Sequence, residues 1–125
     1  MEYLWVGLGG FFGANVRYIL GVWIVGRVGP GFPFHTFLIN VTGSLVIGLL
    51  MVLLTERFIT DPAWRLLLVV GFLGGYTTFS SYTFEALTLM EQGNWLAAAW
   101  YVIGSNGVGL AAAYLGMVLA RVLAR

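Results

Sequence analysis

Four long apolar stretches, separated only by short breaks, constrain this chain more than any other feature of its sequence. They cover residues 3–25, 34–54, 62–90 and 95–119. Each is long enough to cross the hydrocarbon core of a bilayer, which is about 30 Å thick and needs about 20 helical residues. Only 9% of the residues are charged, against about 25% in an ordinary soluble domain. We therefore predict an all-α integral membrane protein, with a single transmembrane domain over residues 1–125 and the lipid bilayer as its solvent.

Composition argues against several other classes of protein. The net charge is +1 and no basic stripe is present, so we expect no nucleic-acid partner. Cysteine is absent, which leaves neither a disulfide framework nor a thiolate metal site. His35 is the single histidine and is expected to be solvated at the edge of the first loop. No nucleophile–base pair is recognisable, and we do not expect an enzyme. Without a basic n-region, the first stretch should remain as a helix rather than be cleaved as a signal peptide.

The breaks between the stretches carry residues that end and begin helices. Glycine and proline dominate residues 26–31, Thr60-Asp61-Pro62 offers a capping residue and then proline, and residues 92–94 end on Asn94, a possible cap. With four spans, both termini and the second loop share one side of the membrane. Four of the six arginines belong to that side, namely Arg57, Arg65, Arg121 and Arg125. This bias favours termini in the cytoplasm.

The third stretch has an unusual centre. Residues 74–85 read GGYTTFSSYTFE, so two adjacent glycines and a cluster of Ser and Thr lie near the bilayer midplane. A break in the helix there would free backbone carbonyls and amides, and it would survive only if it were buried in protein, faced water or bound an ion. Freed carbonyls suit a small hard cation, and freed amides suit an anion. The alternative is a continuous helix whose hydroxyls bond back to carbonyls one turn earlier.

Small and polar residues form stripes on the other stretches. In the second stretch they recur every four residues, at Thr36, Asn40, Ser44 and Gly48. In the fourth they recur at Tyr101, Ser105, Gly109 and Ala113, with Asn106 beside them. Such stripes serve either close helix packing or a ligand path, and the amide of Asn40 is costly to bury without a partner. The pairs Gly9/Gly13 and Gly71/Gly75 indicate packing alone.

Arg17 and Glu85 are the two charged residues placed inside spans. A charge at membrane depth is a functional hypothesis by default. We expect Arg17 to snorkel into a water-filled vestibule rather than bind an ion directly. Glu85 lies one turn after Ser81, which suits a hydrated pathway, although the position equally fits a helix end near the surface.

Three motifs at suitable separations along the chain resemble the Fluc (CrcB) family of fluoride channels. They are residues 74–82 (GGYTTFSSY), residues 9–18 (GGFFGANVRY), and residues 40–44 (NVTGS) with Gly48. The resemblance covers nearly the whole chain, including its length and its four spans. It implies a fluoride-selective channel of the inner or plasma membrane that exports fluoride passively and confers fluoride resistance. It also implies an antiparallel, dual-topology homodimer with two anion pathways.

The resemblance assigns roles to individual positions. It implies a structural sodium ion at the dimer centre, bound by backbone carbonyls of the broken third spans at Gly74 and Thr77. It implies an anion pathway that includes a pore asparagine, two aromatic positions, a polar track and a vestibule arginine. In this sequence these positions are Asn40; Phe79 and Tyr82; Thr36, Ser105 and Glu85; and Arg17.

Three features depart from the family pattern. Tyr82 stands where the family usually has phenylalanine, so its hydroxyl could replace the ring edge as an anion contact. Gly109 stands where a hydroxyl is expected in the polar track. The third departure is the arginine bias, because insertion in both orientations favours a balanced number of arginines on the two sides of the membrane. It allows a pairing with an oppositely oriented paralogue, although we favour a homodimer because this chain carries both the pore and the cation-site motifs.

Two other classes of protein remain as alternatives. A small proton-coupled drug exporter also has four spans, but it needs a buried carboxylate, and the only acid of the first stretch is Glu2 at its end. A non-conducting membrane subunit would explain the glycine faces. It would not explain the Thr, Ser and Phe cluster in the middle of the third stretch.

Overall fold

The computed structural model describes residues 1–57 and 61–125, which are helical apart from short connections and the chain ends. The elements in chain order are α1 (Glu2–Val28), α2 (Phe34–Val52), the π-helical turn η1 (Leu53–Arg57), α3 (Pro62–Arg65), the π-helical segment η2 (Leu66–Leu73), α4 (Gly74–Tyr76), α5 (Phe79–Glu91) and α6 (Trp95–Leu123). They combine into four segments long and apolar enough to cross a membrane, namely Glu2–Val28, Phe34–Arg57, Pro62–Glu91 and Trp95–Leu123. The prediction of an all-helical chain with four potential spans is confirmed.

The helices begin and end where the sequence carries stop and start residues. Gly29 follows α1 with a φ of 83°, a conformation that L side chains rarely adopt. Asp61 caps α3, because its Oδ1 accepts a hydrogen bond from Ala63 N at 2.9 Å, and Pro62 is the first helical residue. Asn94 Oδ1 likewise accepts from Ala97 N at 3.4 Å at the start of α6. Thr60 lies outside the described residues.

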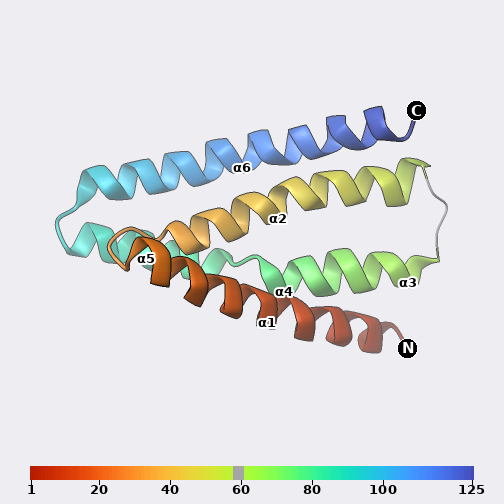
Figure 1. Cartoon of the computed structure of the whole chain (residues 1–125), viewed down its shortest axis with the longest axis horizontal. Helices are drawn as coiled ribbons and strands as arrows, with labels where there is room; N and C mark the ends of the chain where they lie inside the picture. The colour runs from red at the N-terminus through yellow and green to blue at the C-terminus, as the bar shows by residue number, and fades with distance from the viewer. Residues whose placement is uncertain (58–60) are drawn as a thin grey trace.

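The four spanning segments run lengthwise beside one another (Figure 1). Both chain termini lie at the same end of the molecule as α3, and α5 lies toward the opposite end, near the α1–α2 connection. At the end that holds the termini, Arg121 Nη2 lies 3.1 Å from Glu56 Oε1, and this ion pair joins α6 to η1. The four arginines predicted to share one side lie in the elements at this end or directly after them.

Glycine faces bring the helices into two close pairs. α1 packs against the third span, and a Cβ atom added at Gly71 or Gly75 would lie 2.7 Å from the carbonyl oxygen of Val6 or Gly10, respectively. α2 packs against α6, where the backbone of Ala113 fills the space beside Gly48. Contacts this close allow no side chain, so the predicted packing role of the glycine pairs is confirmed.

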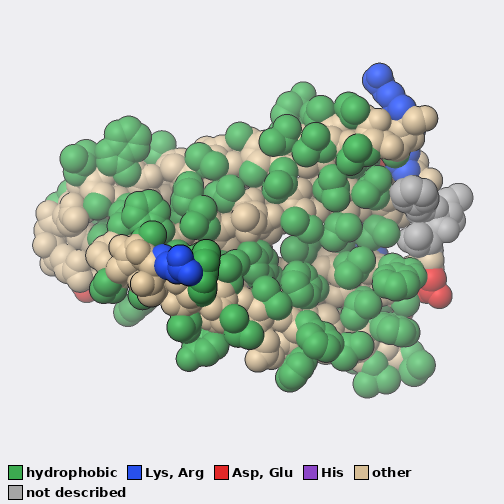
Figure 2. All heavy atoms as spheres, in the orientation of Figure 1, with side chains coloured by type: hydrophobic (Ala, Val, Ile, Leu, Met, Phe, Trp, Pro, Cys, Tyr) green, Lys and Arg blue, Asp and Glu red, His purple; other side chains and the backbone are tan. Residues whose placement is uncertain are grey.

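The outer surface carries many large apolar side chains. Figure 2 shows hydrophobic side chains spread across the visible face. Large apolar residues are exposed in the single chain, among them Tyr3 (90%), Leu110 (74%) and Ile103 (67%). A surface of this kind fits a lipid solvent and a further protein partner rather than water.

Candidate functional site

The third span is interrupted between α4 and α5 by two extended residues. Thr77 has φ −82° and ψ 157°, and Thr78 has φ −149° and ψ 118°. Gly74 remains helical, with φ −61° and ψ −36°. The interruption therefore begins after the glycine pair, at the two threonines, and not at the glycines themselves.

The interruption redirects backbone hydrogen bonds. Thr77 N still donates to Leu73 O at 3.0 Å, as in a helix. Thr78 N donates instead to Asn40 Oδ1 at 2.8 Å, so the carbonyl of Gly74 loses the donor that a continuous helix would give it. Ser81 N turns to Thr78 Oγ1 at 3.3 Å, which removes the helical donor of the Thr77 carbonyl in the same way. The two carbonyls released by these changes are those that the family resemblance assigns to a cation.

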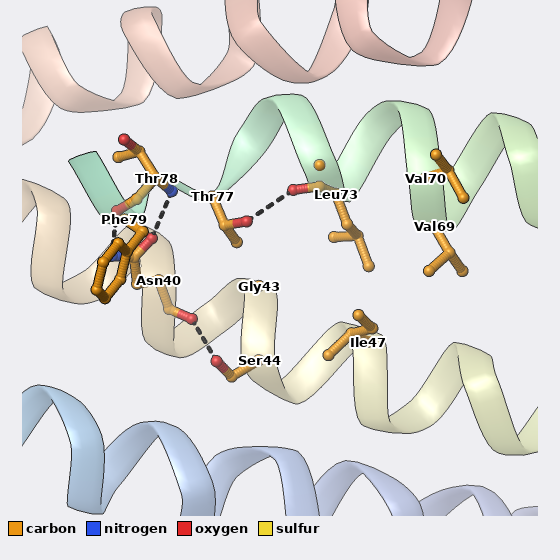
Figure 3. Close-up of a pocket in the computed structure, with 11 residues that line it drawn as sticks. Asn40, Gly43, Ser44, Ile47, Val69, Val70, Leu73, Thr77, Thr78 and Phe79 are labelled. Atoms are coloured by element: carbon orange, nitrogen blue, oxygen red, sulfur yellow. Dashed lines mark hydrogen bonds between the residues drawn. The ribbon is translucent and has the colours of Figure 1, made fainter. Parts of the chain in front are cut away.

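Asn40 of α2 braces the interruption through both ends of its amide. Its Oδ1 accepts from Thr78 N, and its Nδ2 donates to Thr78 O at 2.9 Å (Figure 3). Ser44 Oγ in turn donates to Asn40 O at 2.7 Å. Since an amide nitrogen carries two hydrogens, one N–H of Asn40 is left for another acceptor.

An open groove of about 390 Å³ runs along this brace. Figure 3 shows its lining side chains between α2 and the third span. Asn40, Thr77 and Thr78 supply its polar groups from the interruption, and Ile47 and Val70 are among its apolar walls. Two further lining residues face outward, because Gly74 is exposed and Phe79 is 76% exposed in the single chain.

A second cavity of about 430 Å³ lies between α1, α2 and α5. Its charged and polar lining residues are Arg17, Tyr18, His35, Thr36, Thr78, Ser81 and Glu85. Arg17 Nη1 donates to Thr77 O at 3.5 Å, a long contact at the edge of hydrogen bonding. The guanidinium thus lines a roomy cavity and lies close to one released carbonyl, while its role in a vestibule stays a prediction.

Glu85 is the centre of a polar cluster that joins three helices. Its Oε1 accepts from Thr36 Oγ1 at 2.8 Å, and its Oε2 accepts from Tyr101 Oη at 2.7 Å. His35 Nε2 lies 3.4 Å from Oε1. Glu85 is therefore held in the middle of α5, and its alternative placement at a helix end is wrong.

His35 lies at the edge of the first loop, as expected, but it is less solvated than predicted. It is the second residue of α2, and its side chain is 31% exposed. Its imidazole fills the space beside the glycine at position 21, where an added Cβ would lie 3.8 Å from His35 Cδ2. Sequence reasoning missed the contact between His35 and Glu85, because nothing in the spacing of these two positions links α2 to α5.

Aromatic rings continue from the interruption toward this cluster. The Phe79 and Tyr82 ring centroids are 5.7 Å apart, and those of Tyr82 and Tyr101 are 5.3 Å apart. Tyr82 Oη accepts from Asn106 Nδ2 at 2.9 Å. The additional hydroxyl at position 82 therefore has a partner on α6, and the sequence signal for it was the place of Asn106 beside the polar stripe of that helix.

Ser105 and Gly109 complete the predicted set on α6. Ser105 Oγ is buried and has no hydrogen-bond partner in the part of the chain that is described. A Cβ added at Gly109 would lie 3.7 Å from Ser44 Oγ, an ordinary contact distance. The structure therefore places Thr36 and Glu85 in direct contact but leaves Ser105 outside their hydrogen-bonded cluster.

Backbone oxygens are the candidate metal ligands that this site offers. No cluster of three or more His, Cys, Asp or Glu side chains suited to a metal ion occurs within residues 1–57 and 61–125. The carbonyls of Gly74 and Thr77 are hard oxygen donors, which suit a cation such as sodium better than a transition metal.

Four apolar spans around half-buried polar groups define a multi-pass membrane protein with a polar interior. Residues 4–117 match the family model described as "CrcB-like protein, Camphor Resistance (CrcB)", and the chain belongs to this family. A relative from Koribacter versatilis (strain Ellin345), named fluoride-specific ion channel FluC, is 51% identical over 111 residues, which cover 89% of this chain and 88% of the relative.

Two further relatives carry the same name. The protein from Solibacter usitatus (strain Ellin6076) is 50% identical over 121 residues, which cover 97% of this chain and 99% of the relative. The protein from Roseiflexus sp. (strain RS-1) is 46% identical over 123 residues, which cover 98% and 99% of the two chains. The relatives are thus described as ion channels and not as enzymes, and the identity extends across all four spans.

Proposed function

We propose that this protein is a fluoride-selective channel through which fluoride leaves the cytoplasm passively across the inner or plasma membrane. The observation that carries the proposal is the interrupted third span, which Asn40 braces from α2 at the edge of a polar groove. The proposal is also supported by the relatives of this chain, which are named fluoride-specific ion channels. An interruption costs stability in lipid unless it is buried in protein, faces water or binds an ion.

The groups along this groove suit a small, strongly hydrated anion. The positive edge of an aromatic ring attracts anions weakly, and the exposed ring of Phe79 offers such an edge. The free N–H of Asn40 adds a donor, and the N-terminal turn of α5 adds positive potential. Conduction needs binding that is weak and spread over several sites. Arg17, which is set back in the second cavity, provides attraction without a tight site.

The polar cluster and its neighbours form the proposed track beside the rings. Thr36, Glu85 and Tyr82 supply hydroxyl and carboxylate groups toward one end of the molecule. We also assign to this track the hydroxyl of Ser105, which is buried and has no hydrogen-bond partner among the described residues. We assign these residues to the path together with Arg17, Asn40 and Phe79.

A structural sodium ion is a further part of the proposal. The carbonyls of Gly74 and Thr77 have lost their helical donors, and hard oxygen ligands suit this cation. Gly74 is exposed on the face where a second chain would bring an equivalent pair to a two-fold axis. The bound ion would satisfy these oxygens and lend positive potential to the anion path.

We also propose an antiparallel homodimer as the conducting unit. Phe79 and Gly74 are exposed beside an open groove, which a single chain leaves without an outer wall. A cysteine introduced after Arg125, in this cysteine-free chain, should react with an impermeant reagent from both sides of the membrane. Labelling from one side only would contradict dual topology of this chain and favour pairing with an oppositely oriented paralogue.

The decisive test of function is efflux from liposomes that contain the purified protein. Vesicles loaded with potassium fluoride or potassium chloride are treated with valinomycin, and a halide electrode follows the released anion. We expect rapid fluoride release while chloride is retained. Release no faster than from protein-free vesicles would refute the channel, and equal release of both anions would refute its selectivity. Proton-driven uptake of a cationic drug by the same vesicles would favour an exporter.

A further inference from the structure

The contact between His35 and Glu85 separates two cavities of the described structure. Both residues line the 430 Å³ cavity that contains Arg17. Both also line a cavity of about 190 Å³ near the α1–α2 connection, together with Pro30 and Gln92. An anion that passes between the two cavities would have to pass this pair.

The pair also decides the sign of charge at this point. Around it, among the described residues, the charged or titratable groups are Arg17 and Tyr18 from α1, Glu85 from α5 and Tyr101 from α6. When His35 is neutral, the charges of Arg17 and Glu85 offset each other. A protonated imidazole would leave one net positive charge, with its ring nitrogen 3.4 Å from the Glu85 carboxylate.

We propose that His35 is a proton-dependent charge partner of Glu85 at the mouth of the anion path, so that protonation of its imidazole increases anion entry. This inference rests on the proposed fluoride conduction. A carboxylate in an anion path repels the permeating ion, and an imidazolium beside it cancels that repulsion. Histidine is suited to the role because its charge changes between about pH 5 and pH 8. The side chains of His35 and Glu85 are 31% and 22% exposed, so protons can reach them.

One unit of charge at this distance from a hydrated path should change the local anion concentration roughly threefold to tenfold. We therefore expect fluoride flux to rise by about that factor when the pH on both sides of the liposome falls from about 7.5 to about 5.5. Protein-free liposomes at each pH correct for the permeation of neutral hydrogen fluoride. The rise should shrink at high salt, because ions screen the charge.

Two substitutions at His35 test the charge directly. His35→Gln keeps a polar side chain but cannot be protonated, so its flux should stay low and independent of pH. His35→Lys keeps a positive charge, so its flux should be high at both pH values. Arg27→Gln is the matched control: it removes a charge near the same end of the molecule, where Arg27 packs over the Trp23 ring, and it should keep the pH profile of the parent.

A second measurement does not depend on flux. Because the chain has one histidine, NMR of histidine-labelled protein reports His35 alone, and its titration should share its midpoint with the flux profile. A parent flux that is equal at both pH values, or an unchanged pH profile in His35→Gln, would overturn the inference. A parent without fluoride flux at either pH would refute the proposed function instead.

Discussion

The substitution Asn40→Asp tests the brace and the proposed pore in one nearly isosteric change. The carboxylate can still accept from Thr78 N, now at 2.8 Å from Asn40 Oδ1. It cannot donate to Thr78 O, which lies 2.9 Å from Nδ2, and it places two oxygen acceptors against each other. A hydrogen bond between helices in a membrane contributes about 0.6 kcal/mol on average and about 1.7 kcal/mol at most. We therefore expect a loss of unfolding free energy of about 1–2 kcal/mol.

The effect on conduction should be larger than the effect on stability. A unit negative charge about 4 Å from a fluoride ion repels it by about 1 kcal/mol in water and about 4 kcal/mol at an effective dielectric constant of about 20. These limits correspond to a loss of flux between about fivefold and about 1000-fold. Since the groove at Asn40 is partly apolar, we expect at least a tenfold loss, measured by fluoride efflux from liposomes.

The control for this substitution is Asn94→Asp. It makes the same chemical change at an exposed helix cap, where Asn94 Oδ1 accepts from Ala97 N and aspartate caps equally well. Its flux should stay within about twofold of the parent. Size-exclusion chromatography should show both variants assembled like the parent. If Asn40→Asp then conducts as fast as Asn94→Asp, Asn40 does not line the anion path.

Three further substitutions address separate parts of the site. Phe79→Ile removes the exposed ring edge while it keeps much of the bulk, so fluoride efflux should fall by about tenfold with assembly unchanged; parental efflux would exclude this ring from the path. Gly75→Ala should destabilise the fold by about 2 kcal/mol or more in denaturant titration, because the new methyl group would meet Gly10 O at 2.7 Å; Gly107→Ala, with open space around it, is the control. Thr77→Val removes the hydroxyl but keeps the backbone carbonyl, so sodium-dependent thermal stabilisation should persist, and its loss would assign the cation to the side chain instead.

Sequence patterns determined the membrane class, and the family resemblance supplied the candidate residues of the site. The lengths of the four stretches and the scarcity of charge leave few alternatives to a four-span protein, because the bilayer requires apolar helices of that length. The spacing of Gly9, Gly13, Gly71 and Gly75 indicated close packing, which the structure confirms. Hydroxyl residues near the centre of the third stretch left two possibilities open, a break and a continuous helix.

Only the tertiary structure decided which groups meet. The interruption lies at Thr77 and Thr78 rather than at the glycines, because Asn40 on another helix offers both a donor and an acceptor to Thr78. Glu85 became the centre of a cluster because Thr36 and Tyr101 approach it from two other helices. Periodicity along one helix shows which residues share a face. The partner of that face depends on how helices distant in sequence pack together, and that depends on the whole set of contacts in three dimensions.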